Sequence, residues 1–492
     1  MTPLVLIHPP AISKRYLQTK FMPYGMGVLY AFLKAHDVPV VQYDFLMEYL
    51  FDAPDDINFH DHENGFSEKD FFSFLKDDGK THKRLRDFIV KYGSRIPPDG
   101  KIYAFSIVAY NQFWASLLLA QYIKQVNPDA VIVFGGPFIT IKPLDTFVGY
   151  GYADYWIKGS GETPLRMLYH AYHNEQKEEE IRRIPGVIYL RQGSIFHNSQ
   201  SCIDAEKELP PDFEGLHIER YCYDLPIIGK NTLFLPYRIS KGCPTGCSFC
   251  TGRLVDHFST KLARKVIGEL TLLADKYQAR AFMFTDASVN GNAHLLSEIC
   301  EGIAEALPGM NWYAYARMEG CSPRLLEQMR RAGCFSLFWG VESANPPTIR
   351  LLGKRFQVEK MFEIIDMSIG LGIRNYIHLI YNTPHETTED MRLFIKLVEH
   401  YIDSGKVVFV PHRFMLEPQS HMYAYPHKYG LTGIKRLQLN IFEREQYVYQ
   451  ETDGKTYDDI LKRNKEHQKM LKSHLEWINL RNAKDNLLRE QM

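Results

Sequence analysis

The chain has 492 residues, of which 45% are hydrophobic, which is enough for roughly two to four domains with buried cores. Its 58 lysines and arginines equal its 58 aspartates and glutamates, and this balance argues against nucleic acid or an anionic membrane surface as a partner. The first ten residues lack the basic segment and cleavage site of a signal peptide, and no window approaches 18 uninterrupted apolar residues. We therefore expect a cytoplasmic protein without a membrane span.

The first 185 residues alternate short apolar runs with helical patterns. We expect strands at Leu4–Ile7, Val38–Phe45, Ile102–Val108, Ala130–Phe134 and Ala153–Lys158, and helices at Gly27–Ala35, Phe113–Lys124 and Thr163–Tyr172. Near-continuous apolar strands that alternate with helices indicate a parallel sheet covered on both faces, as in doubly wound, flavodoxin-like domains. The charged residues 46–100 predict a helical insertion that serves as a lid or a packing element.

Two glycine-rich loops follow strands of this predicted sheet. One contains Gly135 and Gly136, and the other contains Gly159 and Gly161. Open α/β sheets bind ligands beyond the carboxyl ends of their strands, and glycine lets the backbone approach a flat ligand closely. Ordinary tight turns are the alternative, but two such loops on one edge favour a ligand.

The second half of the chain predicts a further α/β unit. Residues 186–231 are expected to form a hairpin and a linker, residues 232–430 a second domain, and residues 431–492 a C-terminal helical cap. The second domain is expected to have six strands, at Thr232–Ile239, Ala281–Thr285, Asn311–Ala316, Cys334–Gly340, Tyr376–Tyr381 and Val407–Phe414. Helical patterns lie between them, and six βα units are too few for a closed eight-stranded barrel. We therefore predict an open, partial (β/α)6 barrel.

Three cysteines follow the first strand of this second series. Cys243, Cys247 and Cys250 are spaced to hold three corners of a 4Fe–4S cube, which leaves one iron open. One alternative is zinc with His257 as a fourth ligand, although no second pair of ligands follows, as it does in most structural zinc sites. A disulfide framework is disfavoured, because the eight cysteines show no regular spacing.

This CxxxCxxC motif, with Phe249 before its last cysteine, resembles the signature of the radical S-adenosylmethionine (SAM) superfamily. Further segments resemble superfamily elements in the same order, namely Gly340–Ser343, Leu351–Lys354 and Asn382–Thr387. The last departs from the usual Gly-x-Pro-Gly-Glu-Thr pattern at Asn382 and His385, which leaves the shape of that turn open.

The N-terminal half resembles the cobalamin-binding domain that precedes the radical SAM domain in one large class. The shared features are His-Pro-Pro, Gly-Gly-Pro, a Gly-x-Gly-Glu loop and the segment Leu209–Leu216 followed by Tyr221. The Asp-x-His-x-x-Gly motif of other cobalamin proteins is absent, as is usual in this class. The resemblance implies a cobalamin at Gly135, Gly136, Gly159 and Gly161.

The resemblance also implies roles for several residues. The three cysteines would hold the cluster, and SAM would bind the open iron and be cleaved to a 5′-deoxyadenosyl radical. SAM contacts are expected from Phe249, Asp286, Arg317, Glu342 and Ser343. The alternatives are a rim salt bridge for Arg317 and a helix cap near Asn292 for Asp286. Tyr381 and Phe414 are expected to belong to the substrate pocket or, more simply, to the buried core.

The function implied is a cobalamin-dependent radical SAM C-methyltransferase that acts on an unactivated carbon of a specialised metabolite. A flavodoxin or ferredoxin would supply the electron. The alternatives are a radical SAM enzyme that dehydrates, cyclises or rearranges its substrate, and, outside catalysis, a metal-cluster sensor or binding module.

Overall fold

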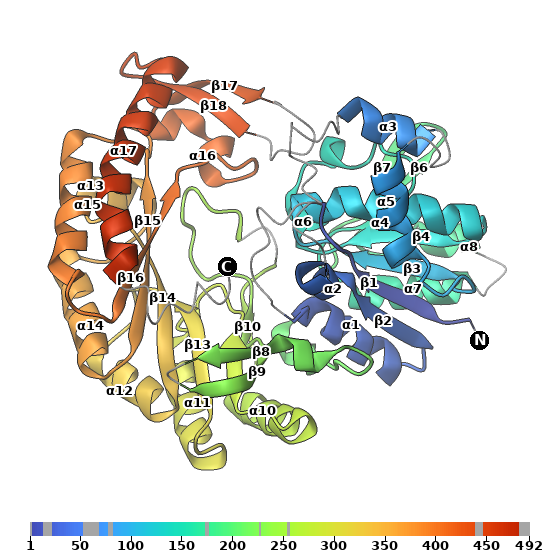
Figure 1. The fold of residues 1–492 in the computed structure, drawn as a ribbon, viewed down its shortest axis with the longest axis horizontal. Helices are drawn as coiled ribbons and strands as arrows, with labels where there is room; N and C mark the ends of the chain where they lie inside the picture. The colour runs from blue at the N-terminus through green and yellow to red at the C-terminus, as the bar shows by residue number, and fades with distance from the viewer. Residues whose placement is uncertain are drawn as a thin grey trace.

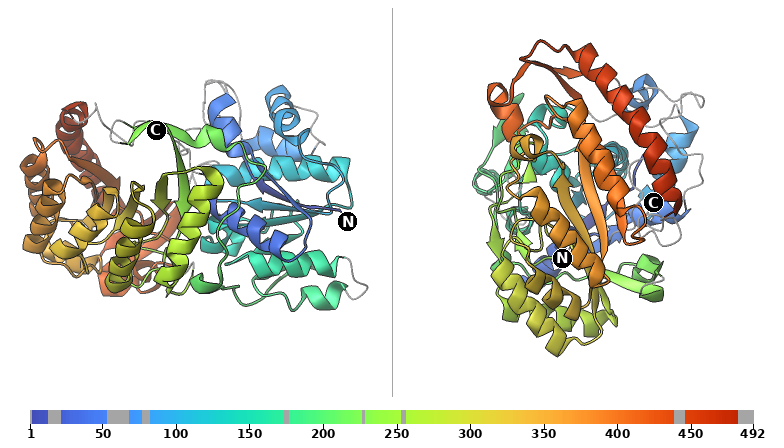
Figure 2. Two further views of the ribbon diagram at one scale, coloured as in Figure 1. Left: turned by 90° about the horizontal axis from the view of Figure 1, so that it is seen from below. Right: turned by 90° about the vertical axis from the view of Figure 1, so that its left-hand side faces the viewer.

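The computed structural model describes residues 2–12, 22–52, 68–76, 82–172, 177–225, 228–252, 256–437 and 446–481. These residues form two α/β domains that lie side by side in Figure 1 and in the left view of Figure 2. In Figure 1 the first domain is blue to cyan, and the second runs from green through yellow to red.

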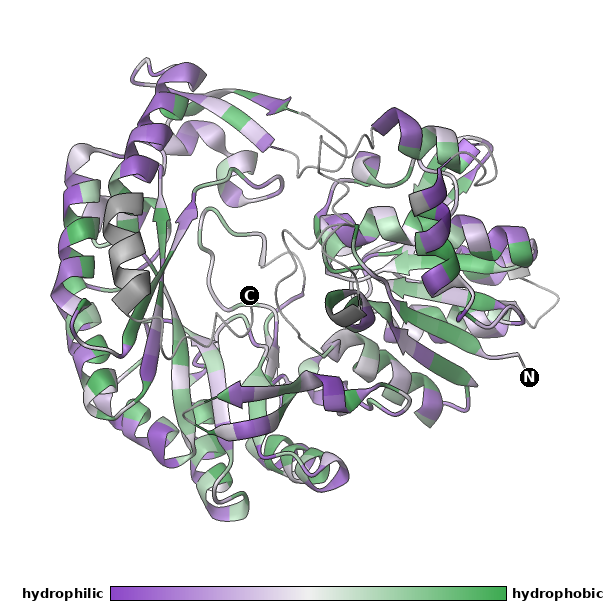
Figure 3. Cartoon of the chain, in the orientation of Figure 1, coloured by the Kyte–Doolittle hydropathy of each residue, from purple (hydrophilic) through white to green (hydrophobic). Residues whose placement is uncertain are grey.

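The first domain is built on a seven-stranded sheet. Across the sheet the order is β2 (Val40–Asp44), β1 (Leu4–His8), β3 (Ile102–Ser106), β4 (Val131–Gly135), β5 (Tyr155–Ile157), β6 (Val187–Arg191) and β7 (Ser194–His197). The first five strands are parallel. The strands at the centre of this sheet are rich in hydrophobic residues (Figure 3). Their apolar side chains alternate between two separate hydrophobic clusters, one on each face of the sheet. This arrangement confirms the predicted doubly wound domain.

Helices cover both faces of this sheet. They are α1 (Tyr24–Ala35), α2 (Phe45–Asp52), α3 (Glu68–Lys76), α4 (Lys83–Gly93), α5 (Tyr110–Val126), α6 (Pro137–Ile141), α7 (Glu162–Ala171) and α8 (Lys177–Ile181). Helices α2, α3 and α4 account for the predicted insertion, of which residues 53–67 and 77–81 lie outside the described part. Phe71 and Phe74 of α3 and Phe88 of α4 are buried in the cluster that contains Trp114. The described part of the insertion is thus a packing element.

The hairpin β6–β7 belongs to the first sheet, whereas the sequence placed it with the linker. Strand β6 pairs antiparallel with β5 through Trp156 and Ile188, and both side chains are buried in the same cluster. The linker also contains β8 (Cys222–Leu225), which pairs antiparallel with the first strand of the second domain.

The second domain is a curled sheet with helices on its convex side. The sheet order is β16 (Val407–Arg413), β15 (Arg374–Tyr381), β14 (Cys334–Glu342), β13 (Asn311–Ala316), β12 (Ala281–Phe284), β9 (Gly229–Tyr237) and β8. Six of these strands, all except β8, are parallel. This pattern confirms the predicted open barrel of six βα units.

The helices of the second domain lie on the outer, convex side of its sheet (Figures 1 and 2). They are α10 (Ala263–Tyr277), α11 (Ala293–Ala306), α12 (Pro323–Arg331), α13 (Pro346–Leu351), α14 (Val358–Gly370) and α15 (Thr388–Tyr401). The main core lies between these helices and the sheet, while a smaller aromatic cluster with Tyr313, Phe338 and Tyr376 covers part of the concave face.

The C-terminal region differs from the predicted helical cap. It contains the antiparallel hairpin of β17 (Leu431–Leu437) and β18 (Gln446–Glu451), followed by the long helix α17 (Tyr457–Arg481). Leu431 and Tyr449 of the hairpin and Ile460 of α17 are buried together, so the hairpin forms because both of its strands cover apolar surface. No helix in the described ranges is both long and apolar enough to cross a membrane.

Candidate active site between the two domains

The three motif cysteines lie on one loop after β9 and the short strand β10 (Ser240–Lys241), and all three thiols are free. Among the described residues, two groups of potential metal ligands have all their ligand atoms within 4.8 Å, and neither contains a motif cysteine. Thiolates that share one zinc ion lie only about 3.8 Å apart, because each Zn–S bond is about 2.3 Å long. The described loop does not gather its three thiols as a single zinc ion would, and three free thiols on one loop suit a 4Fe–4S cube.

His257 is not a fourth ligand of this loop. Its Nε2 atom lies 2.6 Å from Oδ1 of Asp204, and its neighbours in a potential ligand group are Cys202 and Asp256. The zinc alternative built on His257 and the motif cysteines is thus wrong.

Asp286 fixes the entrance to the cysteine loop. Its side chain is 2% exposed, and its oxygens accept hydrogen bonds from the backbone N–H groups of Ile239 (3.0 Å) and Ser240 (2.6 Å) and from the Ser240 hydroxyl. Burial raises the pKa of Asp286, and these donors act in the opposite sense. The predicted alternative, a cap for the following helix, is wrong because Asn292 caps α11 itself. Direct contact between Asp286 and SAM stays a prediction.

The segment Leu351–Lys354 holds the other side of the loop. The Ser248 N–H donates to the Leu352 carbonyl (3.1 Å), and the Ser248 hydroxyl donates to the Leu351 carbonyl (2.7 Å). Gly353 has φ +75°, and a Cβ there would lie 3.0 Å from the Gly246 oxygen and 3.3 Å from the Cys247 Cα. Glycine is therefore required at 353 both for its backbone conformation and for the space that the loop occupies.

Glu342 and Lys354 form a buried ion pair beside the loop. Glu342 ends β14 with φ +67°, a left-handed conformation, and one of its oxygens lies 3.2 Å from Lys354 Nζ. Burial raises the pKa of Glu342, although Lys354 lowers it in part. Burial also raises the pKa of the Cys247 thiol, and Lys354 opposes that shift too. Lys354 thus links the Glu342 carboxylate to the cysteine loop electrostatically. The sequence pattern included Lys354 but gave it no role.

Arg317 lies in a cavity behind the cysteine loop. This cavity, of about 840 Å³, is lined by Thr245 and Gly246 of the loop and by Arg317 and Glu319. The Arg317 guanidinium contacts Glu319 (3.1 Å), yet its Nε is buried with no hydrogen-bond partner among the described residues. Asn290, which the sequence did not single out, holds the Arg317 backbone through its amide group. The predicted salt bridge therefore exists, and one donor is left for a ligand.

Ser343 and Phe249 flank this region in different ways. The Ser343 hydroxyl accepts a hydrogen bond from the Asn345 N–H (3.0 Å) and so shapes the turn into α13. Phe249 packs against the C-terminal apolar cluster and also lines a second cavity.

This second cavity, of about 770 Å³, lies between the two domains. Phe249, Cys250 and Thr251 line it from the cysteine loop, and Arg413 and Met415 line it from the end of β16. Its other wall is residues 108–111, which follow β3, together with Phe138 and Lys142. The carboxyl edges of both sheets therefore face one cavity, with the cysteine loop between them (Figure 1).

The four predicted glycines of the first domain line a third cavity, of about 170 Å³. Gly136 has φ +96° and Gly159 has φ +87°, and a Cβ at either would clash with a neighbouring backbone carbonyl, of Ile107 or Ser201. Tight packing therefore explains these glycines, as the alternative of ordinary turns expects. Their backbones also border a cavity, and a ligand in it stays a prediction.

A buried charge network between the domains was missed from the sequence. Glu208 of the linker is fully buried and pairs with Arg238, Lys241 (3.6 Å) and Lys261 (3.8 Å). Lys241 also donates to the Ser160 hydroxyl (2.8 Å), at the edge of the third cavity. These charges lie far apart in the chain, so spacing gave no signal for them.

Two histidines on the concave face were also missed. His378 Nδ1 lies 2.8 Å from His412 Nε2, and the two rings are nearly parallel. Burial lowers the pKa of His378 to about 4, so its imidazole is neutral at pH 7. The sequence places both histidines in neighbouring predicted strands, and this was the only available sign that they could lie close together.

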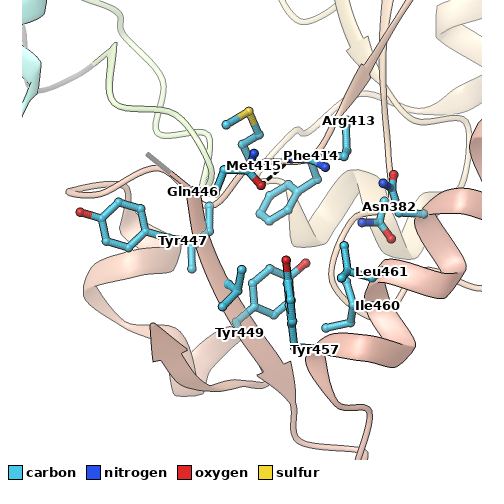
Figure 4. Close-up of a pocket in the computed structure, with 13 residues that line it drawn as sticks. Asn382, Arg413, Phe414, Met415, Gln446, Tyr447, Tyr449, Tyr457, Ile460 and Leu461 are labelled. Atoms are coloured by element: carbon cyan, nitrogen blue, oxygen red, sulfur yellow. Dashed lines mark hydrogen bonds between the residues drawn. The ribbon is translucent and has the colours of Figure 1, made fainter. Parts of the chain in front are cut away.

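Tyr381 and Phe414 are core residues, as the simpler expectation held. Tyr381 belongs to the main core, and Phe414 belongs to the C-terminal cluster. Phe414 lines a small cavity of about 50 Å³ with Asn382, Tyr449 and Tyr457, between the C-terminal hairpin and α17 (Figure 4).

The turn after β15 has a left-handed backbone at both positions where the chain departs from the superfamily pattern. Asn382 has φ +59° and His385 has φ +58°, which are the left-handed conformations that glycine adopts readily. Glu386 accepts a hydrogen bond from the Asn382 N–H (2.8 Å) across the turn.

Comparison with known proteins agrees with this site. Residues 237–398 match the model of the Radical SAM superfamily, so this stretch of the chain is a radical SAM domain. The chain is 25% identical over 285 residues to an uncharacterised methyltransferase of Pyrococcus horikoshii, covering 57% of this chain and 60% of that protein. It is 23% identical over 286 residues to the anaerobic magnesium-protoporphyrin IX monomethyl ester cyclase of Rubrivivax gelatinosus, covering 57% and 51%. The chain thus spans little more than half of the length of these relatives.

Among solved structures, the chain resembles the radical SAM methyltransferase TsrM from Kitasatospora setae, solved with cobalamin and a [4Fe-4S] cluster bound. The TM-score is 0.65 at 16% identity, and the match covers 89% of this chain and 81% of that one. This likeness shows that both domains have the fold of that protein.

Proposed function

We propose that the protein is a cobalamin-dependent radical SAM enzyme that methylates an unactivated carbon of a small-molecule specialised metabolite. The observation that carries this proposal is the cavity between the domains. It is bordered by Cys250 of the cysteine loop on one side and by the carboxyl edge of the first sheet on the other. A ligand at each edge would face the same space, which is what transfer of a group between two cofactors and a substrate requires.

The side chains suit these ligands. Cys243, Cys247 and Cys250 would hold the cluster, and the Glu342 carboxylate, which pairs with Lys354 beside the loop, would meet the ammonium group of SAM. The unpaired Nε of Arg317 is a donor for the SAM carboxylate or ribose. Gly135, Gly136, Gly159 and Gly161 would border the corrin tail, because their cavity opens at the carboxyl edge of the sheet. When bound, these cofactors supply hydrogen abstraction and a methyl group, while the chain orients them and excludes water.

The distribution of reaction products tests this proposal. Anaerobically reconstituted protein, prepared with cobalamin, is incubated with SAM and dithionite, and the products are quantified by mass spectrometry. We expect S-adenosylhomocysteine in addition to 5′-deoxyadenosine, with both lost in Cys247→Ala. Production of 5′-deoxyadenosine without S-adenosylhomocysteine would overturn methylation.

A second candidate is a radical SAM reaction that cyclises or rearranges its substrate without methyl transfer. The similarity to the cyclase of Rubrivivax gelatinosus favours it. The same product analysis separates the two, because this reaction yields no S-adenosylhomocysteine. A metal-cluster sensor, the candidate outside catalysis, would cleave no SAM at all.

The proposal includes a protein reductant and a reducing cellular setting. A flavodoxin or ferredoxin of the cytoplasm would deliver the electron, because a 4Fe–4S cube of low potential needs such a donor. Replacing dithionite with purified flavodoxin, its reductase and NADPH in the same assay tests this part.

A further inference from the structure

A second group of metal-binding side chains lies outside the cysteine motif. Cys202 follows the first domain, whereas Asp256 and His257 follow the cysteine loop in the second. The thiol, one carboxylate oxygen and one imidazole nitrogen all lie within 4.8 Å of one another. A thiolate, a carboxylate and an imidazole together make a donor set typical of zinc.

One oxygen of the buried Asp256 carboxyl group has no geometric hydrogen-bond partner in the described chain. Asp256 is 9% exposed, the oxygen concerned is Oδ1, and the Cys202 thiol is close enough to interact with this carboxyl group. Lys241 lies 3.5 Å from Oδ2, but that ammonium also serves Ser160 and Glu208. A buried carboxylate oxygen without a partner is costly, so the position favours a bound cation.

His257 is oriented as metal-bound histidines are. Its Nε2 lies 2.6 Å from the Asp204 carboxylate, which leaves the other ring nitrogen for a ligand. A carboxylate behind a histidine fixes the ring and raises the basicity of its ligating nitrogen. The backbone of His257 packs closely on Gly242. A Cβ added at Gly242 would lie only 2.7 Å from the His257 carbonyl carbon.

We propose that Cys202, Asp256 and His257 bind one zinc ion, with Asp204 as the partner of the histidine and the fourth position open to water. The thiolate and the carboxylate together neutralise the charge of the ion. The site would tie two segments together. Ser201 bridges to Gly159 at the edge of the first sheet, and Gly242 packs on His257 at the start of the cysteine loop. The zinc ion would thus fasten the first domain to the base of that loop. This inference does not depend on methyl transfer.

Metal analysis of the full chain tests the site. The anaerobically reconstituted protein is incubated with zinc chloride, desalted and analysed for zinc and iron by mass spectrometry. We expect about one zinc per chain, reduced to near zero in Cys202→Ser and His257→Gln, with iron unchanged. Cys222→Ser and His217→Gln are matched controls, because both residues lie elsewhere on the linker, and they are expected to retain the zinc.

The Cys243→Ala/Cys247→Ala/Cys250→Ala variant separates this site from the cluster. It should lose its iron and keep its zinc. X-ray absorption at the zinc edge should then show one sulfur at about 2.3 Å and nitrogen or oxygen ligands at about 2.0–2.2 Å. Zinc that persists in Cys202→Ser, or that disappears in the triple variant, would overturn the proposal, whichever reaction the enzyme performs.

Discussion

Two buried carboxylates near the cysteine loop have different tasks. Asp286 accepts hydrogen bonds from the chain at the start of the loop, so it acts on backbone geometry. Glu342 faces the Lys354 ammonium, so it acts through charge. Substitutions that keep the size of the side chain and change its charge or acceptors separate these tasks.

Asp286→Asn should loosen the cysteine loop. An amide offers only one acceptor oxygen, so one buried N–H loses its partner, at a cost of about 1–3 kcal/mol. We expect a lower melting temperature and faster loss of iron from the reconstituted protein, followed by absorbance of the cluster under a chelator. Asp275→Asn, at an exposed position of α10, is the control and should retain iron as the wild type does. Equal iron retention in both variants would remove the assigned role of Asp286.

Lys354→Met should weaken SAM binding in a pH-dependent manner. Burial already raises the pKa of Glu342, and removing the cation that opposes this shift raises it further. More Glu342 is then protonated near neutral pH, and attraction for the SAM ammonium is lost. We expect SAM affinity, measured by calorimetry, to fall about tenfold at about pH 7 and to recover partly at about pH 8.5. Exposed Lys396→Met is the control. An equal loss at both pH values would show that charge on Glu342 is not the cause.

At the scale of elements, the barrel strands were predictable because they are near-continuous apolar runs. The hairpin β6–β7 and strand β8 were assigned to the linker, because whether a short strand joins a sheet depends on a partner distant in the chain. The same reason applies to the site. The cysteines were found from spacing, whereas the Glu342–Lys354 pair depends on a positive φ at Glu342 that no pattern revealed.

Gly353→Ala tests whether the turn at Gly353 supports the cysteine loop. The left-handed backbone at Gly353 costs alanine about 1–2 kcal/mol, and the new methyl group presses on Gly246 and Cys247. Gly309→Ala is the matched control, because Gly309 has φ +80° with nothing within 4 Å of its added Cβ. Both variants should lose stability in thermal unfolding, and Gly353→Ala should lose more, because its methyl group also meets the loop. Only Gly353→Ala should also lose iron faster, and equal iron loss in both would contradict this.

At the scale of the molecule, the domains are joined through Glu208. Burial opposes ionisation of this carboxyl, but Arg238, Lys261 and Lys241 outweigh it and lower its pKa to about 2. An acid with a lowered pKa stabilises the fold above its ordinary pKa near 4.5, and this stability is lost as pH falls toward 2.

Glu208→Gln should therefore destabilise the protein at neutral pH, by about 3–5 kcal/mol, because buried cations lose their partner. Its melting temperature should also fall less than that of the wild type as pH is lowered from about 5 to about 3. Glu219→Gln, at an exposed linker position, should behave as the wild type. Parallel pH profiles for Glu208→Gln and the wild type would show that the network does not control acid stability.

The two sides of the cavity between the domains are fastened unequally. On the linker side lies the buried network of Glu208, whereas the described contacts of the opposite side include Arg436–Asp145 (2.8 Å), Lys142–Glu417 (3.9 Å) and a hydrogen bond from Gln419 to the Ile141 carbonyl. Of these, the ion pair of Arg436 is solvent-exposed and is weakened by salt. The described contacts between the domains are thus buried on the linker side and partly exposed to solvent on the opposite side. Raising the ionic strength should weaken the exposed Arg436–Asp145 pair and leave the buried Glu208 network largely intact. Salt should therefore change how easily the domains separate on the side opposite the linker, where a large ligand would enter the cavity.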